Sequence, residues 1–378
     1  MRRVLVFAII LVCALSSLSA TYEFGTTGLS FTWAPIDPLF KESRAYQYNN
    51  NVAFRYLMAP SDTKYLATDI LVADKTANEG QGGYKRLSFK DPNTGNNAYW
   101  NLKAAINAGL FRFSWHNYLQ LELYLHGGLN TIFGAYGGVD VLGFDGFYGA
   151  GASLSVFDIV TLRFGFHHFS GHWGDETLND FYSKAETANY KYSGLTEYTR
   201  NNSWLFDISI QPVSWFRVFA EVELPQHVGW IRPAAHVPAD TVKNTSEESP
   251  DADKPLSDYI YRQEGLVNSN DEYPSSYKAW RIGVGAEVEI PIPTVGLAYL
   301  ALDMQFHQDG KINLETLQYE EDRPWDFEYT IALGMSLQED ERMPEVTIEV
   351  AWHDGRFPLL NFFFQESRYF SAGILLTL

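Results

Sequence analysis

The chain has 378 residues and a formal net charge of −18, an acidic balance that argues against nucleic acid as a partner, because phosphates attract a basic face. Aromatic residues make up 16% of the chain, a content that acidic disordered proteins lack. The single cysteine, Cys13, lies in the first 20 residues, so the remainder predicts neither a disulfide nor a thiol nucleophile.

Residues 1–20 have the pattern of a secretory signal peptide. Two arginines precede an apolar run over residues 4–15, and small residues lead to Ala20. The run is shorter than the ~20 residues that a spanning helix needs, which favours cleavage before Thr21 over a membrane anchor. No longer apolar stretch follows. If the mature chain lives in a membrane, it must therefore cross it as a β-barrel.

Residues 21–64 form a less regular segment. Pro35, Pro38 and an Asn-Asn-Asn run at 49–51 interrupt its hydrophobic pattern. The stretches 22–33 and 46–57 could each add one strand, so the strand count is least certain here.

From residue 65 to residue 378, apolar and polar side chains alternate in long runs. The clearest run covers residues 325–337, where every second side chain from Trp325 to Leu337 is apolar. Such strands suit either a soluble sandwich or a membrane barrel whose apolar face meets lipid. Their length of about ten to fourteen residues and their aromatic ends favour the barrel.

The connections alternate between short and long, as in outer-membrane barrels. Short turns are expected at 114–117, 157–159, 212–214, 291–294 and 338–343. Long connections are expected at 74–97, 173–201, 225–277, 308–323 and 354–366. A soluble β-sandwich does not require this alternation of short and long connections. The sequence therefore predicts an all-β, antiparallel transmembrane outer-membrane barrel of about twelve strands, between ten and fourteen, with a long acidic external loop at 225–277.

The last strand keeps its apolar alternation to residue 378, which fits a signal for the outer-membrane assembly machinery. Outer-membrane lipids are the other expected partners. Nothing in the sequence indicates the oligomeric state.

Residues 161–176 carry an unusual row of side chains. The apolar face of this strand, with Leu162 and Phe164, continues into His168, Ser170 and His172. The order of the loops places this tip at the outer rim, facing lipid. The next strand begins with Asn202 on the same face, at about the same height.

A serine nucleophile needs a base within hydrogen-bond reach and a third group that orients the base. His168, Ser170 and Asn202 could supply these three roles, and the substrate would be an acyl ester of an outer-leaflet lipid. The alternative is that these side chains belong to the aromatic girdle or form a hydrogen-bond network at the rim.

A metal or lipid-headgroup site is a further alternative. Asp175 and Glu176 offer the oxygen ligands that calcium prefers, and His172 lies beside them. His168 and His172 would be about 13 Å apart in an extended strand, too far to share one ion.

The element His168-Phe169-Ser170 resembles the His-x-Ser element of outer-membrane phospholipase A and the lipid A deacylases. Those families are barrels with catalytic residues on the outside, and in the phospholipase an asparagine on a strand completes the triad, which Asn202 matches. The phospholipase continues Ser-Asn-Gly, whereas this chain continues with Gly171 and His172.

A broader resemblance links the chain to an uncharacterised family of bacterial outer-membrane proteins, known only as a domain of unknown function. The shared pattern is His168-x-Ser170-x-His172-x-Gly174-Asp175-Glu176. The resemblance implies a barrel and brings no activity.

The polar faces of the strands predict a lumen of mixed charge, rich in acid. Its expected lining is Arg163, His167, Arg217, Glu221, Glu223, Arg281, Glu287, Glu289, Glu328 and Glu349. The protein could thus be a cation-preferring pore, or a structural barrel filled by its own side chains. A surface ligand-binding protein that acts through the 225–277 loop is a third possibility.

Overall fold

The computed structural model describes residues 19–35, 37–58, 69–74, 83–88, 98–134, 141–174, 199–225, 280–308, 311–313, 318–320, 325–337, 345–360 and 366–377. The predicted signal peptide, up to residue 18, and the 226–279 part of the acidic loop lie outside these ranges. In the part of the chain that is described, no helix has the length and apolar character needed to cross a membrane.

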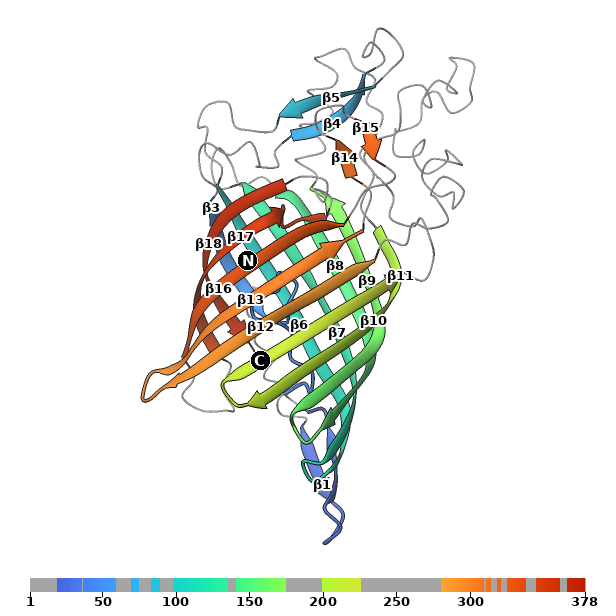
Figure 1. Ribbon diagram of the computed structural model, residues 1–378, viewed down its shortest axis with the longest axis vertical. Coiled ribbons are helices and arrows are strands. Elements are labelled where there is room, and N and C mark those ends of the chain that lie inside the picture. Colours follow the sequence, from blue (N-terminus) through green and yellow to red (C-terminus); the bar gives the residue numbers. More distant parts are fainter. Residues whose placement is uncertain are drawn as a thin grey trace.

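Within the described ranges, twelve antiparallel strands form a closed barrel (Figure 1). They are β3 (Val52–Met58), β6 (Ala98–Trp115), β7 (Leu119–Gly134), β8 (Val141–Val156), β9 (Val160–Trp173), β10 (Thr199–Val213), β11 (Phe216–Pro225), β12 (Arg281–Ile292), β13 (Gly296–His307), β16 (Asp326–Leu337), β17 (Glu345–Arg356) and β18 (Glu366–Thr377). The wall closes where β3 pairs with β18 on one side and β6 on the other. The prediction of an all-β antiparallel barrel of about twelve strands is confirmed.

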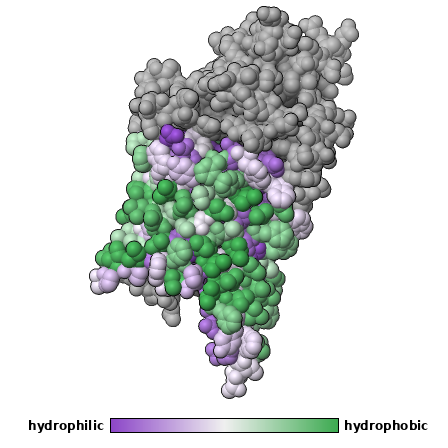
Figure 2. All heavy atoms as spheres, in the orientation of Figure 1, coloured by the Kyte–Doolittle hydropathy of each residue, from purple (hydrophilic) through white to green (hydrophobic). Residues whose placement is uncertain are grey.

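The two faces of the wall differ as the alternation predicts. Side chains such as Phe164, Leu333 and Ile348 are 47%, 55% and 57% exposed on the outside. Figure 2 shows apolar residues gathered over the barrel strands. Charged side chains on the opposite face, among them Arg163 and Glu287, are buried in the lumen. An apolar exterior around a polar interior is the arrangement of a transmembrane barrel.

Short turns join the strands at one end of the barrel, the short-turn end. They comprise residues 116–118, 157–159, 214–215 and 293–295, close to four of the predicted turns. The fifth predicted turn, 338–343, lies outside the described residues. Two separate hairpins, β4–β5 (Asp69–Asp74 with Gly83–Ser88) and β14–β15 (Lys311–Asn313 with Gln318–Glu320), follow β3 and β13 in the chain.

One position in the wall is shared by two strands. β3 pairs with residues 98–104 of β6, and β2 (Leu29–Trp33) pairs with residues 111–115 of the same strand. β1 (Ala20–Glu23) adds an outer strand to β2 beyond the barrel (Figure 1). Between β2 and β3, residues 34–51 turn into the lumen, and we call them the plug segment. Ile36 within it is not described.

Candidate functional site

The row predicted on β9 lies on the outward face of the wall. His168, Ser170 and His172 are partly exposed, whereas the alternating residues His167 and Phe169 are buried on the lumen side. This difference follows from the two-residue period of the strand. The row lies near the end of the barrel opposite the short turns.

Ser170 contacts the histidine that follows it in the strand. Its Oγ lies 3.1 Å from Nε2 of His172 and 3.4 Å from the carbonyl oxygen of Gly146. The His172 ring stacks on Phe144 of β8, with ring centroids 4.7 Å apart and planes 21° apart. This stacking fixes the imidazole plane beside the hydroxyl. A serine and a histidine at this distance are a chemically competent pair of nucleophile and base.

His168 lies on the other side of Ser170 and has different neighbours. It is directly opposite Asn202 of β10 and Tyr148 of β8, and its ring stacks on Tyr148 with centroids 4.7 Å apart. Its Nδ1 is buried and has no hydrogen-bond partner among the described residues. The structure thus brings His168 to Asn202 and brings Ser170 to His172. The catalytic roles of His168, Ser170 and Asn202 stay a prediction.

A glycine of the neighbouring strand lies beside the serine hydroxyl. Gly146 is directly opposite Ser170, and a Cβ atom at position 146 would lie 3.3 Å from Ser170 Oγ. Phe144 and Tyr148, two residues away on the same strand, project to the same face on either side of Gly146. A side chain at position 146 would crowd the Ser170 hydroxyl and Leu129, so the glycine allows the two strands to carry the serine at this position.

A β-bulge interrupts the ladder next to this site. The register shifts between Arg200 and Asn202, so that Asn201 has no counterpart on β9. Bulges re-aim the side chains around them and often lie next to functional sites. Here the bulge sets the position of Asn202 opposite His168.

Of the three predicted calcium ligands, the structure describes only His172. Asp175 and Glu176 lie outside the described residues, and His172 is in contact with Ser170 and Phe144. In the described ranges, no three His, Cys, Asp or Glu side chains are grouped to hold a metal ion. Calcium at this rim stays a prediction.

The plug segment occupies the lumen and is held mainly by polar contacts. Arg44 donates from Nε to Glu289 of β12 at 2.8 Å and from Nη1 to Glu345 of β17 at 2.6 Å. The Glu42 carboxylate forms an ion pair with Arg163 of β9, with 2.8 Å between Oε1 and Nη1. The lumen residues predicted from sequence face inward, and several of them are thus partners of the plug rather than the lining of an open channel.

Asp145 of β8 holds together two segments that enter the lumen. Its carboxylate accepts a hydrogen bond from the Tyr48 hydroxyl of the plug at 2.9 Å. Its other oxygen accepts one from the backbone N–H of Leu360 at 3.0 Å. Leu360 belongs to residues 357–360, which follow β17 and fold inward, with Phe357 and Leu359 buried.

Sequence reasoning missed the plug and its anchor Arg44. The available signal was the loss of period-two alternation between residues 34 and 51, in a stretch rich in tyrosine and asparagine. This signal marks a segment that is not a wall strand, but it does not say that the segment lies inside.

No protein-family model matches the chain, and no curated protein is similar to it. Among solved structures, outer membrane phospholipase A from Escherichia coli aligns at 10% identity, over 90% of this chain and 95% of that one, with a TM-score of 0.41. The Salmonella typhi outer membrane phospholipase dimer with bound calcium aligns at 11% identity, over 90% of this chain and 95% of that one, with a TM-score of 0.42. A Pseudomonas aeruginosa FadL homologue aligns at 11% identity, over 89% of this chain and 93% of that one, with a TM-score of 0.35.

These likenesses are distant. Identities of about a tenth and low TM-scores transfer no property of those proteins to this chain. The resemblance of the His-x-Ser-x-His-x-Gly-Asp-Glu motif to an uncharacterised family likewise stays a prediction, because no family model matches.

Proposed function

We propose that this protein is an outer-membrane enzyme that cleaves an acyl ester of a membrane lipid at the outward face of its barrel. The observation that carries the proposal is the distance of 3.1 Å between Ser170 Oγ and His172 Nε2, on the outward face of the wall, where large apolar side chains such as Phe164 and Tyr148 are exposed. Nucleophile and base here would meet a substrate from the lipid phase, not from the lumen.

In the proposed reaction, His172 Nε2 takes the hydroxyl proton while Ser170 Oγ attacks the ester carbonyl carbon. The tetrahedral intermediate collapses, and the alcohol part of the lipid leaves with the proton from His172. Water then attacks the acyl-serine with His172 as base, releasing the fatty acid and restoring Ser170.

His168 has a supporting role in this proposal. Its position opposite Asn202 and its stacking on Tyr148 suit a group that contacts the polar part of the lipid and positions the ester. This assignment differs from a triad in which His168 is the base. The two assignments predict different effects of substitutions.

The test is ester hydrolysis by detergent-purified protein on radiolabelled phospholipid and lipid A. Ser170→Ala should lower fatty-acid release by about 10³-fold or more, the range found when a serine nucleophile is removed. Ser214→Ala, in the short turn after β10, serves as the matched control and should keep full activity. Unchanged release by Ser170→Ala contradicts the proposal.

Two histidine variants separate the roles. His172→Gln should reduce kcat by about 10²- to 10⁴-fold, as loss of a general base does. His168→Gln should mainly raise KM and leave kcat within about tenfold, because a positioning residue contributes to binding. The reverse pattern would assign the base to His168.

A non-catalytic barrel is the second candidate function. The occupied lumen favours it over an open pore, because the plug segment contacts strands on several sides of the wall, including β8, β9, β12 and β17. In that case Ser170 and His172 form a hydrogen-bonded pair in the girdle, and no lipid in the panel is cleaved.

A further inference from the structure

An aromatic cluster lies on the lumen side of the wall, directly behind Ser170 and His172. Phe147 of β8 and Phe169 of β9 are opposite each other, with ring centroids 5.7 Å apart, and both are buried. Because side chains alternate along a strand, Phe169 points inward between His168 and Ser170, which point outward. The cluster therefore belongs to the same backbone segments as the proposed nucleophile and base.

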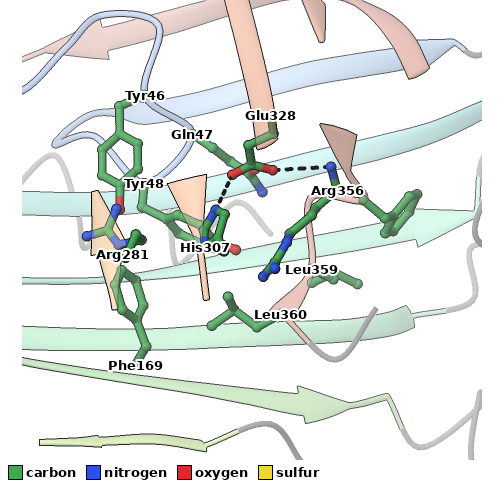
Figure 3. Close-up of a pocket in the computed structure, with 11 residues that line it drawn as sticks. Tyr46, Gln47, Tyr48, Phe169, Arg281, His307, Glu328, Arg356, Leu359 and Leu360 are labelled. Atoms are coloured by element: carbon green, nitrogen blue, oxygen red, sulfur yellow. Dashed lines mark hydrogen bonds and ion pairs between the residues drawn. The ribbon is translucent and has the colours of Figure 1, made fainter. Parts of the chain in front are cut away.

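Tyr48 of the plug segment packs against both rings of this cluster. Its ring centroid lies 5.7 Å from that of Phe147 and 5.1 Å from that of Phe169, with interplanar angles of 79° and 64°. Edge-to-face contacts at this separation are a favourable arrangement of aromatic rings. Tyr48, Phe169 and Leu360 line the same small cavity in the lumen (Figure 3). The plug thus supplies the third ring of a cluster whose other two rings belong to the wall.

The Tyr48 hydroxyl adds a polar contact to the same part of β8. It donates to Asp145 at 2.9 Å, and Asp145 follows Phe144, whose ring stacks on His172. The Asp145 carboxylate also accepts a hydrogen bond from the backbone N–H of Leu360 at 3.0 Å. Loss of the hydroxyl alone would therefore leave this carboxylate with a donor, whereas loss of the whole side chain would also remove the packed ring.

The geometry of Ser170 and His172 depends on how β8 and β9 lie against each other. The His172 ring stacks on Phe144 of β8, and Ser170 Oγ lies 3.4 Å from the carbonyl oxygen of Gly146 on the same strand. Protein interiors are closely packed, and the surroundings of a deleted ring relax only partly into the space. A shift of β8 against β9 would change the contact between Oγ and Nε2, on which proton transfer depends.

We propose that Tyr48 is a positioning residue for Ser170 and His172, and that it acts through the wall by way of Phe147 and Phe169. The effect on catalysis rests on the proposed function, since Tyr48 holds in place the nucleophile and base named there. Tyr48 lies in the lumen and cannot touch a lipid at the outward face. The plug would thus set the rate of the reaction without contributing to substrate binding.

The first test is lipid ester hydrolysis by the detergent-purified full-length protein. Tyr48→Ala should lower kcat by about 10- to 100-fold, because small displacements of catalytic groups by remote substitutions cost up to about 10² in rate. KM should stay within about threefold, since no contact with the lipid is lost. Tyr48→Phe keeps the ring and should keep kcat within about threefold of the wild type. Unchanged kcat in Tyr48→Ala contradicts the proposal, and Tyr48→Leu carries the same expectation if Tyr48→Ala does not fold.

Phe40→Ala is the matched control. Phe40 is another buried ring of the plug, and it lies against Arg163, with 4.3 Å between the ring centroid and Cζ. Arg163 precedes Ser170 by about 23 Å along an extended strand. Phe40→Ala should lower the unfolding temperature as Tyr48→Ala does, but keep kcat within about threefold of the wild type. An equal fall of kcat in both variants would indicate a general effect of plug packing and overturns the proposal.

A second measurement does not depend on enzyme activity. Diethyl pyrocarbonate modifies accessible imidazole nitrogens, and mass spectrometry gives the rate at His172. Tyr48→Ala should raise this rate about threefold or more, because loss of the Ser170 contact exposes Nε2, and Phe40→Ala should not. If the intact protein cleaves no lipid but His172 responds in this way, the esterase proposal fails and the coupling through the wall stands. Unchanged reactivity of His172 in Tyr48→Ala overturns the coupling, whether or not the protein is an esterase.

Discussion

Lys103 is a fully buried cation whose hydrogen bonds all go to the plug. Its ammonium group, 0% exposed, donates to the carbonyl oxygens of Gln47 at 3.0 Å and Asn49 at 2.8 Å, and to the side chain of Asn49. An ammonium group has three protons, so these three acceptors use all of them. The residue is thus satisfied by the plug rather than by a carboxylate.

Lys103→Met should lower the free energy of unfolding by about 3 kcal/mol, because three acceptors of the plug lose their donor inside the barrel. Urea unfolding in micelles measures the change. Lys41→Met, at an exposed position of the same segment, should stay within about 0.5 kcal/mol of the wild type. Equal stability of the two variants would show that Lys103 does not hold the plug.

The partner of Ser170 could not be read from the sequence. Histidines stand two residues before it and two residues after it, and both lie on the same face of the strand. The neighbouring strand makes the difference, since Phe144 stacks on His172 and Tyr148 stacks on His168. The sequence does not give the register between neighbouring strands. The spacing along one strand therefore identified the residue types of the site but not the hydrogen bonds between them.

At the level of elements, β6 shows how the N-terminal strands relate to the barrel. β6 has 18 residues, whereas its neighbour β3 has 7, so more than half of one edge of β6 extends past β3. β2 pairs with residues 111–115 at the end of that edge, and the Phe31 ring lies 5.0 Å from Phe113. An uncovered edge strand is a template for aggregation, and we expect β2 to limit it here.

Deletion of residues 21–33 should therefore leave a closed barrel that aggregates more readily. The twelve wall strands keep all their pairings without β1 and β2. Heat-modifiable mobility on gels should persist, and light scattering at rising protein concentration should increase. Loss of heat-modifiable mobility would mean that the hairpin is needed for closure. Deletion of β3, residues 52–58, should abolish closure and is the contrasting variant.

The wall strands were predictable because a physical period repeats in them. Residues 325–337 alternate strictly, and β16 (Asp326–Leu337) covers nearly the same range. The plug has no period, and its contacts reach residues that lie 301 positions later in the chain, as between Arg44 and Glu345. Local sequence patterns do not show which residues pair over such distances, so the filled lumen could not be predicted.

For the whole molecule, we expect the plug to decide whether the barrel conducts ions. Ala34 and Asn51 bond to Leu110 and Ala105 of β6, five residues apart, or about 17 Å along an extended strand. Six linker residues reach about 20 Å and can bridge this distance. A variant in which six Gly and Ser residues replace residues 36–49 therefore keeps both wall connections.

This variant should give ion currents in planar bilayers, whereas the intact protein should give no steady current. Removal of Arg44 frees Glu289 and Glu345 to face the lumen, so the current should prefer cations. The reversal potential in a potassium chloride gradient measures this preference. Anion preference would contradict the acid-lined lumen, and absence of current would mean that other residues also fill it.

Both ends of the plug segment continue directly into strands that pair with β6, and this has a consequence for biogenesis. β3, the strand that follows the plug, also forms the seam with β18, the last strand of the chain. A filling element with a free end could enter after the wall is complete, but this one is joined directly to β3, the strand that completes the wall. We therefore expect the seam to close and the lumen to fill in a single step of assembly.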